Sequence, residues 1–304
     1  MNENQPSITS MVTAYIRAYH SMHAINKIFD DFLAYDMIPE EIRAQIGLYL
    51  TDDKQLNNSG HSELQSDKVI ALASLLRKNN IIARARYTEE TLEKAIRQGV
   101  KQYIILGAGL DTFAFRRPDL MEQVEVFEVD HPSTQGFKRN RIAELGWKHP
   151  AKLHFIPIDF TKENLETVIT RFPSYDPNVK SFFSWLGVTM YLTQEEVFAT
   201  LRSITKVTQT GSIVVFNYSD LDAFIPNKLS LDTQKYRKIC QKMGEPITTG
   251  FNPSILAEDL KSLGLMLYEN LSSEDIERLY FEGRTDGYHI SENSHFACAK
   301  VVQK

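Results

Sequence analysis

KQYIILGAGLD, residues 101–111, is the stretch of sequence that decides the fold. It begins with the apolar run YIIL and continues directly into Gly107, Ala108 and Gly109, with Asp111 two residues later. An apolar run without alternation is typical of a strand that helices cover on both faces of a parallel sheet. Glycines directly after such a strand let the backbone turn and approach a ligand closely. The stretch therefore predicts an α/β protein that binds a ligand where this strand ends.

Six further β-rich runs follow along the chain, and helical stretches separate most of them. Strands that alternate with helices form parallel βαβ units, so we expect a doubly wound, Rossmann-like sheet of seven strands. The sheet should be mostly parallel, with the last strand antiparallel. The expected strands are QYIILG (102–107), VEVFEVD (124–130), KLHFIPIDF (152–160), KSFFSWLG (180–187), GSIVVFNYS (211–219), LMLYEN (265–270) and SHFACAKVV (294–302).

The first hundred residues have helical periodicity, because apolar residues recur every three or four positions. We expect helices over residues 11–29, 62–78 and 88–99. In the last of these, Thr88 offers N-cap chemistry and Gly99 is placed to stop the helix.

A stretch of mixed polarity between residues 219 and 252 has helical periodicity around residues 229–244 and is typical of an inserted lid. A chain of 304 residues is long enough for one large elaborated domain. We therefore expect a helical cap over residues 1–100 and the sheet domain over residues 101–304, with the lid inside it.

Composition excludes several classes of protein. Hydrophobic residues make up 42% of the chain, so it can bury a core, and the net charge of -5 offers no large positive field for nucleic acid. Cys240 and Cys298 lie far apart, which provides no zinc set and suits a reducing compartment. The N-terminus lacks a basic segment followed by an apolar one, and no run approaches the length of a membrane helix. We expect a cytoplasmic protein that acts on neither membranes nor nucleic acid.

Open α/β sheets bind ligands beyond the carboxyl ends of their strands, and four expected strands deliver useful residues there. Asp130 ends the second strand, where a carboxylate can accept both ribose hydroxyls of an adenosine. Asp159 and Phe160 end the third strand and offer an acceptor for an adenine amino group beside an aromatic wall. Gly187 lets the chain turn after the fourth strand, and Tyr191 is placed to line the reacting centre.

The dinucleotide fingerprint requires a third glycine three places after Gly109, where Thr112 stands. A close-packed pyrophosphate turn is therefore disfavoured. Asp130 suits nicotinamide cofactors and S-adenosylmethionine alike, so both classes of cofactor remain open at this point.

Together, five motifs resemble in their order the leucine carboxyl methyltransferase family, and the resemblance covers about residues 80–220. It is closest to bacterial small-molecule O-methyltransferases similar to the polyketide carboxyl methyltransferase of tetracenomycin synthesis. The motifs are ARAR (83–86), LGAGLDTFAFR (106–116), VFEVDHP (126–132), IDF (158–160) and LGVTMYL (186–192).

The resemblance implies a seven-stranded class I methyltransferase fold with a helical cap and a lid. It also implies S-adenosylmethionine as the cofactor and S-adenosylhomocysteine as the product. An arginine of ARAR would hold the methionine carboxylate, and Arg84 is preferred over Arg86. Gly107 would pass under the methionine portion, and the acids would bind the ribose and the adenine. The implied cofactor-binding residues are Arg84, Arg86, Gly107, Ala108, Gly109, Asp130, Asp159, Phe160, Leu186 and Gly187.

Two departures from the family pattern bear on the substrate. Many members carry Glu where this chain has Leu186, and some carry Arg where it has Phe113. Both favour a small-molecule acceptor over a protein phosphatase tail. An ionised carboxylate needs no general base, and no histidine–carboxylate pair stands near the motifs, which favours a carboxylic acid as the acceptor.

Simpler interpretations stand beside these roles. Asp159 can cap a turn, Arg84 and Arg86 can pair with Glu89 and Glu90, and Tyr191 can serve packing alone. At the level of the whole protein the alternatives are a nicotinamide-dependent oxidoreductase and a protein that binds S-adenosylmethionine without transferring methyl groups. The sequence does not predict the oligomeric state.

Overall fold

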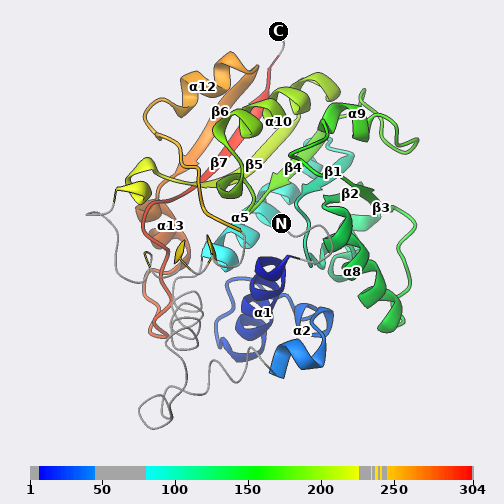
Figure 1. Cartoon of the computed structure of the whole chain (residues 1–304), viewed down its shortest axis with the longest axis vertical. Coiled ribbons are helices and arrows are strands. Elements are labelled where there is room, and N and C mark those ends of the chain that lie inside the picture. Colours follow the sequence, from blue (N-terminus) through cyan, green and yellow to red (C-terminus); the bar gives the residue numbers. More distant parts are fainter. Residues whose placement is uncertain are drawn as a thin grey trace.

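The computed structural model describes residues 7–44, 80–225 and 245–302, together with residues 234, 237, 238, 240 and 241. Their core is a seven-stranded sheet in the order β3-β2-β1-β4-β5-β7-β6 (Figure 1). The strands are β1 (Gln102–Leu106), β2 (Glu125–Asp130), β3 (Leu153–Pro157), β4 (Ser181–Trp185), β5 (Ile213–Ser219), β6 (Leu265–Leu271) and β7 (Ser294–Val301).

All seven predicted strands are present. β1 to β5 pair in parallel, whereas β7 runs antiparallel to both β5 and β6, which confirms the prediction for the last strand. The strand order reverses between β1 and β4, because β2 and β3 lie on one side of β1 and β4 and β5 on the other. In sheets of this kind the ligand crevice lies at such a reversal, at the carboxyl ends of the strands.

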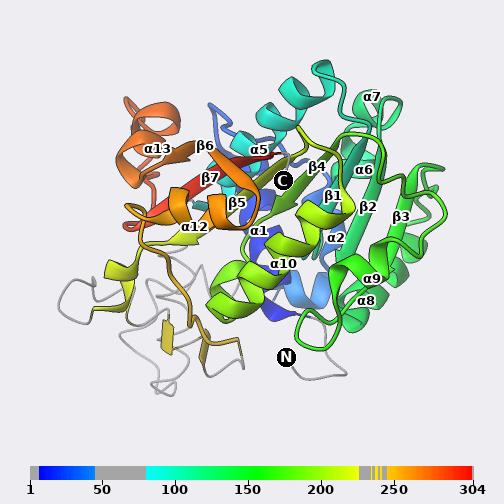
Figure 2. The ribbon, with the colours of Figure 1, turned by 90° about the horizontal axis from the view of Figure 1, so that it is seen from above.

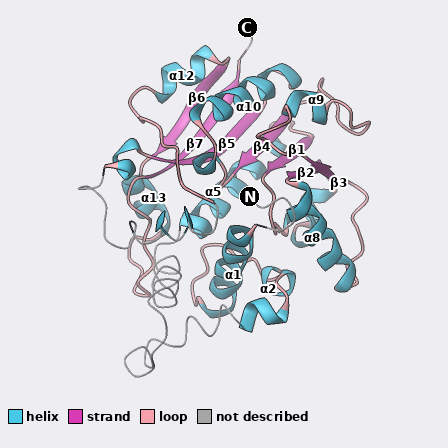
Figure 3. Cartoon of the chain, viewed as in Figure 1, coloured by secondary structure: helices cyan, strands magenta, loops and turns pink. Residues whose placement is uncertain are grey.

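Helices cover both faces of the sheet (Figures 2 and 3). Residues of β1 show why: Tyr103 and Ile105 pack in the cluster that contains α5, whereas Ile104 and Leu106 pack in the cluster that contains α10. Successive side chains of a strand point to opposite faces, so a strand buried on both faces must be apolar throughout. The helices are α1 (Ile8–His23), α2 (Ala34–Met37), α5 (Asn80–Arg97), α6 (Phe113–Arg116), α7 (Pro118–Met121), α8 (Pro132–Glu144), α9 (Leu165–Ile169), α10 (Gln194–Val207), α12 (Leu256–Ser262) and α13 (Ser273–Tyr280), with the 3₁₀ turns η2 (Thr189–Tyr191) and η3 (Leu221–Phe224).

Helix α5 begins eight residues earlier than predicted. Thr88 is buried inside it and is therefore not an N-cap, because the apolar face of the helix already starts at Ile81 and Ile82. The predicted stop is correct: Gly99 has φ +95° directly after the helix. Both arginines of ARAR consequently lie on α5.

Helix α1 ends at His23, whereas the periodicity predicted a helix to residue 29. The chain turns instead, and the Ile28 N–H donates to Nε2 of His20 at 2.9 Å. The predicted helix over residues 62–78 lies outside the described residues, as does most of the helical stretch predicted over residues 229–244. Among the helices that are described, none combines the length and the apolar character that crossing a bilayer requires.

Candidate cofactor and acceptor site

The glycine turn after β1 is locked between two other strand ends. Gly107 has φ +71°, and its N–H donates to the Val129 carbonyl at 2.7 Å. A Cβ on Gly107 would lie 2.2 Å from Cγ2 of Val188, so the loop after β4 packs directly on this glycine. Ala108 beside it is buried, and Gly109 has φ +54°. Only glycine fits at position 107, because both its conformation and its neighbour exclude a side chain.

Asp130 ends β2 and joins it to the glycine turn. Its Oδ1 accepts a hydrogen bond from the His131 N–H at 2.6 Å, and its Oδ2 accepts one from the Gly109 N–H. Burial raises the pKa of Asp130 above its ordinary value. A carboxylate has about two acceptor positions on each oxygen, so one on each remains for a ligand hydroxyl. The residue therefore has a structural role that the sequence did not reveal, and it retains the capacity for a ribose.

Asp159 follows β3 and is partly committed to its own turn. Its Oδ1 accepts hydrogen bonds from the Thr161 N–H at 3.0 Å and the Thr161 hydroxyl at 2.6 Å, while Nζ of Lys162 lies 3.3 Å from Oδ2. Burial opposes ionisation, but these bonds hold the pKa of Asp159 below its ordinary value. Asp159 thus caps a turn, as the simpler interpretation predicted. Its Oδ2 also lies 3.9 Å from Nε2 of His131 beside the end of β2, which corrects the expectation that no histidine–carboxylate pair stands near the motifs.

An aromatic pair lies next to this position. The ring centroids of Phe160 and Trp185 are 6.2 Å apart, which brings the residues after β3 together with the end of β4. Trp185 is fully buried, and its Nε1 has no hydrogen-bond partner among the described residues. The residues after β3 therefore reach across the carboxyl ends of β2 and β1 to the end of β4.

The structure separates the two arginines of ARAR. A Cβ built on Gly187 would lie 2.6 Å from Nη2 and 2.8 Å from Nη1 of Arg84, so the guanidinium of Arg84 lies directly against the turn after β4. Arg86 is exposed on α5 and pairs with Glu90 at 2.7 Å. Of the two, Arg84 is the one at the carboxyl edge of the sheet. Leu186, before Gly187, packs against the cluster that contains α5.

Tyr191 lies in η2 where several elements converge. Burial raises the pKa of Tyr191 well above its ordinary value, and the neighbouring Cys240 and Glu245 add to that effect. A hydrogen bond from the Thr9 side chain and the positive charge of Arg84 oppose it. The tyrosine is thus close to α1, to α5 and to the segment that begins at Glu245.

Glu245 is a residue that the sequence analysis missed. It is 8% exposed, and its Oε2 has no hydrogen-bond partner among the described residues. The chain that follows is bound to η2, because the N–H groups of Thr248 and Thr249 donate to the Met190 carbonyl at 2.9 and 3.3 Å. In the sequence, Glu245 is recognisable only as an acid between Gly244 and Pro246 in the predicted lid, and nothing in the pattern predicted that it would be buried.

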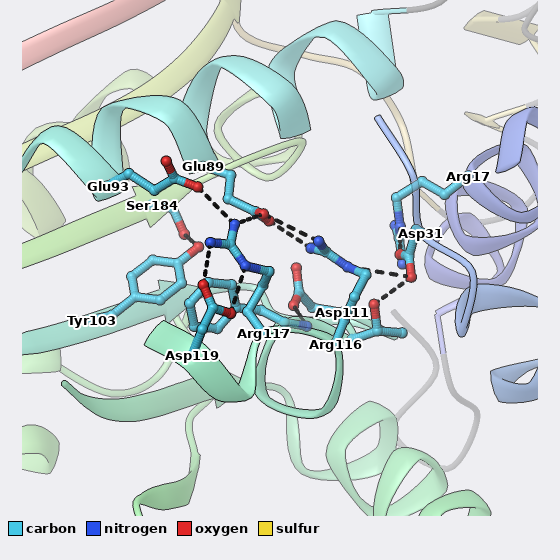
Figure 4. Close-up of polar contacts among 12 residues, drawn as sticks. Arg17, Asp31, Glu89, Glu93, Tyr103, Asp111, Arg116, Arg117, Asp119 and Ser184 are labelled. Atoms are coloured by element: carbon cyan, nitrogen blue, oxygen red, sulfur yellow. Dashed lines mark hydrogen bonds and ion pairs between the residues drawn. The ribbon is translucent and has the colours of Figure 1, made fainter. Parts of the chain in front are cut away.

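A chain of ion pairs, which we call the α1–α5 network, lies beside the site (Figure 4). Arg116 donates to Glu89 at 2.6 and 3.1 Å, and Arg17 donates to Asp31 at 2.8 Å. Arg17 also donates to the Leu110 carbonyl in the glycine turn at 2.7 Å. The network therefore fixes helices α1 and α5 to the loop after β1.

Comparison with known proteins agrees with the cofactor site that the geometry indicates. The profile of a family described as leucine carboxyl methyltransferase matches residues 10–205. A protein of Bacillus subtilis (strain 168), named "Putative S-adenosyl-L-methionine-dependent methyltransferase YktD", is 38% identical over 97% of this chain and 98% of its own length.

Two solved structures are similar in fold. A DUF574-family protein from Streptomyces avermitilis superposes with a TM-score of 0.56 at 12% identity, covering 84% of this chain and 96% of that protein. A protein from Thermobifida fusca, whose name reads "putative methyltransferase", superposes with a TM-score of 0.52 at 15% identity, covering 85% of this chain and 94% of that protein.

Proposed function

We propose, for a chain that belongs to the leucine carboxyl methyltransferase family, that the methyl acceptor is an oxygen of a small molecule, in the first place a carboxylate. The protein is a methyltransferase that uses S-adenosylmethionine, which sets aside the nicotinamide-dependent alternative. One observation carries the cofactor site on which this proposal rests: the glycine turn, Asp130, Phe160 and Arg84 all lie at the carboxyl edge where the strand order reverses.

The residues at this edge suit the parts of the cofactor. Arg84 supplies a guanidinium for the methionine carboxylate, and Asp130 retains acceptor positions for the ribose hydroxyls. Phe160 offers a face for the adenine, and Oδ2 of Asp159 faces its amino group. Gly107, Ala108, Gly109, Leu186 and Gly187 form the floor beneath the methionine portion. We propose Arg84 rather than Arg86, because Arg86 is exposed and paired with Glu90.

S-adenosylmethionine supplies an already activated methyl group, so the chain mainly has to orient the acceptor and exclude water. In this proposal helix α1 and the described segment from Glu245, which falls within the predicted lid (residues 219–252), do this. Ser10 of α1 lies against Gly109, and the segment after Glu245 is bound to η2. A carboxylate acceptor is ionised at neutral pH and needs no proton removed. In this proposal Tyr191 contacts the acceptor without acting as a base.

One observation favours a second candidate, a hydroxyl acceptor. A hydroxyl needs a base, and the buried Glu245 has a carboxylate oxygen without a hydrogen-bond partner among the described residues, near Tyr191. In that case Glu245 would accept the proton of the acceptor hydroxyl while the hydroxyl oxygen receives the methyl group.

Labelled methyl transfer distinguishes the two acceptors. The protein is incubated with methyl-labelled S-adenosylmethionine and a fraction of small metabolites, and the product is treated with mild alkali. A methyl ester releases labelled methanol under these conditions, whereas a methyl ether keeps its label. We expect alkali-labile product. Alkali-stable product would replace the carboxylate with a hydroxyl, and binding of S-adenosylhomocysteine with no transfer to any acid or alcohol would indicate a non-catalytic binding protein.

A cytoplasmic location is part of the same proposal. It is supported by Cys240 and Cys298, which are both buried thiols and are not joined in a disulfide, as in proteins of a reducing compartment.

A further inference from the structure

Asn217 is a buried residue of β5 to which the roles above assign no task. Its side chain is 1% exposed, and its Oδ1 accepts a hydrogen bond from the Gly187 N–H at 2.7 Å. Because Oδ1 accepts this bond, the other terminal atom of the amide is the donor Nδ2. This donor is buried and has no hydrogen-bond partner among the described residues. A buried donor without a partner costs stability, so it calls for an explanation such as a ligand.

The position of Asn217 in the strand sets the face of the sheet to which it belongs. Val215 packs in the cluster that contains α5, whereas Phe216 packs in the cluster on the opposite face. Strand alternation therefore directs Asn217 toward α5. Arg84 comes from α5, and its guanidinium lies against Gly187. Asn217 and Arg84 thus meet at the same glycine, one from the strand and one from the helix.

Asn217 also lies beside the turn after β4. Trp185 pairs with Phe216 in parallel register, so Leu186 and Asn217 follow side by side. Leu186 packs against the apolar cluster and offers no hydrogen bond. The amide of Asn217 supplies a hydrogen-bond donor beside Leu186, at the carboxyl edge of the sheet.

We propose that Nδ2 of Asn217 donates a hydrogen bond to the carboxylate of S-adenosylmethionine that Arg84 binds. This inference rests on the proposed role of Arg84. A carboxylate suits the position because its oxygens only accept hydrogen bonds, and the guanidinium and the amide both donate. Asn217 fixes the methionine end of the cofactor from the strand side, while its Oδ1 keeps the turn at Gly187 in place.

The test compares two ligands that differ in the amino-acid portion. S-adenosylhomocysteine carries the carboxylate, whereas 5′-methylthioadenosine keeps the adenosine and the thioether and lacks the amino-acid group. Asn217→Asp is the informative variant, because it keeps an acceptor for the Gly187 N–H and removes the donor. We expect calorimetry to show about a tenfold or greater loss of affinity for S-adenosylhomocysteine, the size expected for a hydrogen bond to a charged group. The affinity for 5′-methylthioadenosine should stay within about twofold of wild type, because that ligand has no carboxylate.

Gln102→Glu is the matched control. Gln102 is a buried residue, 2% exposed, at the start of β1, which is the end of the strand away from the glycine turn. Its amide donates to the Asp176 carbonyl and to the Ser181 hydroxyl. This control should alter stability without changing the ratio of the two affinities. If Asn217→Asp does not fold, Asn217→Ala is measured in the same way.

Equal losses for both ligands, or no loss for either, would overturn the role of Asn217. Failure of the wild-type protein to bind S-adenosylhomocysteine would instead overturn the proposed site itself, so the two failures are distinguishable.

Discussion

Two polar regions of this molecule lie close together and differ in how their buried groups are matched. In the α1–α5 network, Arg17, Arg116, Asp31 and Glu89 face one another as ion pairs within the chain (Figure 4). Nε of Arg116 has no hydrogen bond among the described residues, but it lies 3.7 Å from the charged Oδ1 of Asp31. At the carboxyl edge of the sheet, the buried atoms Nδ2 of Asn217, Nε1 of Trp185 and Oε2 of Glu245 have no such partner among the described residues. Matched charges hold elements together, whereas unmatched groups are available to a ligand. The first region should therefore govern stability and the second should govern binding.

Arg116→Ala should have the largest effect, and on stability. The Arg116 side chain is 7% exposed, and its removal takes an ion-pair partner from the buried carboxylate of Asp31 and from the half-buried carboxylate of Glu89. Breaking a buried ion pair costs about 3–5 kcal/mol of the free energy of unfolding. Urea denaturation measures this cost. Arg86→Ala is the control, because its exposed pair with Glu90 is worth at most about 0.5 kcal/mol. Equal effects of both variants would contradict the stabilising role of the network.

Gly107→Ala should have the second-largest effect, and it should lower both stability and ligand affinity. The added Cβ would meet Val188 at 2.2 Å in a backbone conformation with φ +71°, which together cost about 2–4 kcal/mol. Because the loop after β4 must move, affinity for S-adenosylhomocysteine should also fall.

Gly99→Ala provides the comparison for that variant. Gly99 also has a positive φ, +95°, but its Cβ would meet nothing within 4 Å. Its cost should be about 1 kcal/mol of unfolding free energy, with unchanged affinity for the ligand. A Gly107→Ala protein that binds as wild type does would show that the turn is not part of the site.

Arg84→Ala should change binding more than stability. Loss of a charge-assisted hydrogen bond to a carboxylate costs about 1.5–3 kcal/mol, or roughly a 10- to 100-fold weaker affinity for S-adenosylhomocysteine by calorimetry. Arg86 is two residues away on the same helix. Arg86→Ala should leave that affinity within about twofold, because an exposed ion pair contributes little. The reverse ranking would move the carboxylate site to Arg86.

The smallest effect should be a dependence of binding on pH. Burial raises the pKa of Asp130, and only its ionised form leaves acceptor positions for both ribose hydroxyls. Affinity for S-adenosylhomocysteine should therefore be complete above that raised pKa and decline as pH falls through it, by on the order of 1 kcal/mol. Asp130→Asn should bind more weakly and lack this decline. A decline that persists in Asp130→Asn would assign it to another group.

The fold was predictable because its central strands β1, β4 and β5 are buried on both faces. β1 is apolar from Tyr103 to Leu106, and β5 has the comparable run IVVF, so the alternation of such strands with helices indicated the parallel sheet. Helix starts were less predictable. α5 extends back to Asn80 because Ile81 and Ile82 pack in the core, and a local capping signal at Thr88 cannot reveal that packing.

The site was predictable to the extent that it lies at strand ends. Asp130, Gly107 and Gly187 follow directly from strand boundaries, and the structure brings them together with Arg84. Asn217 and Glu245 could not be found in this way. A polar residue inside an apolar strand or a lid becomes informative only when its burial and its missing partner are known, and both are properties of distant elements.

A crystal structure of the protein with S-adenosylhomocysteine tests the central claim most directly. The account predicts the ribose at Asp130, the adenine against Phe160, and the carboxylate between Arg84 and Asn217. Density for the ligand at any other place, with Asp130 and Arg84 still in their present contacts, would contradict it.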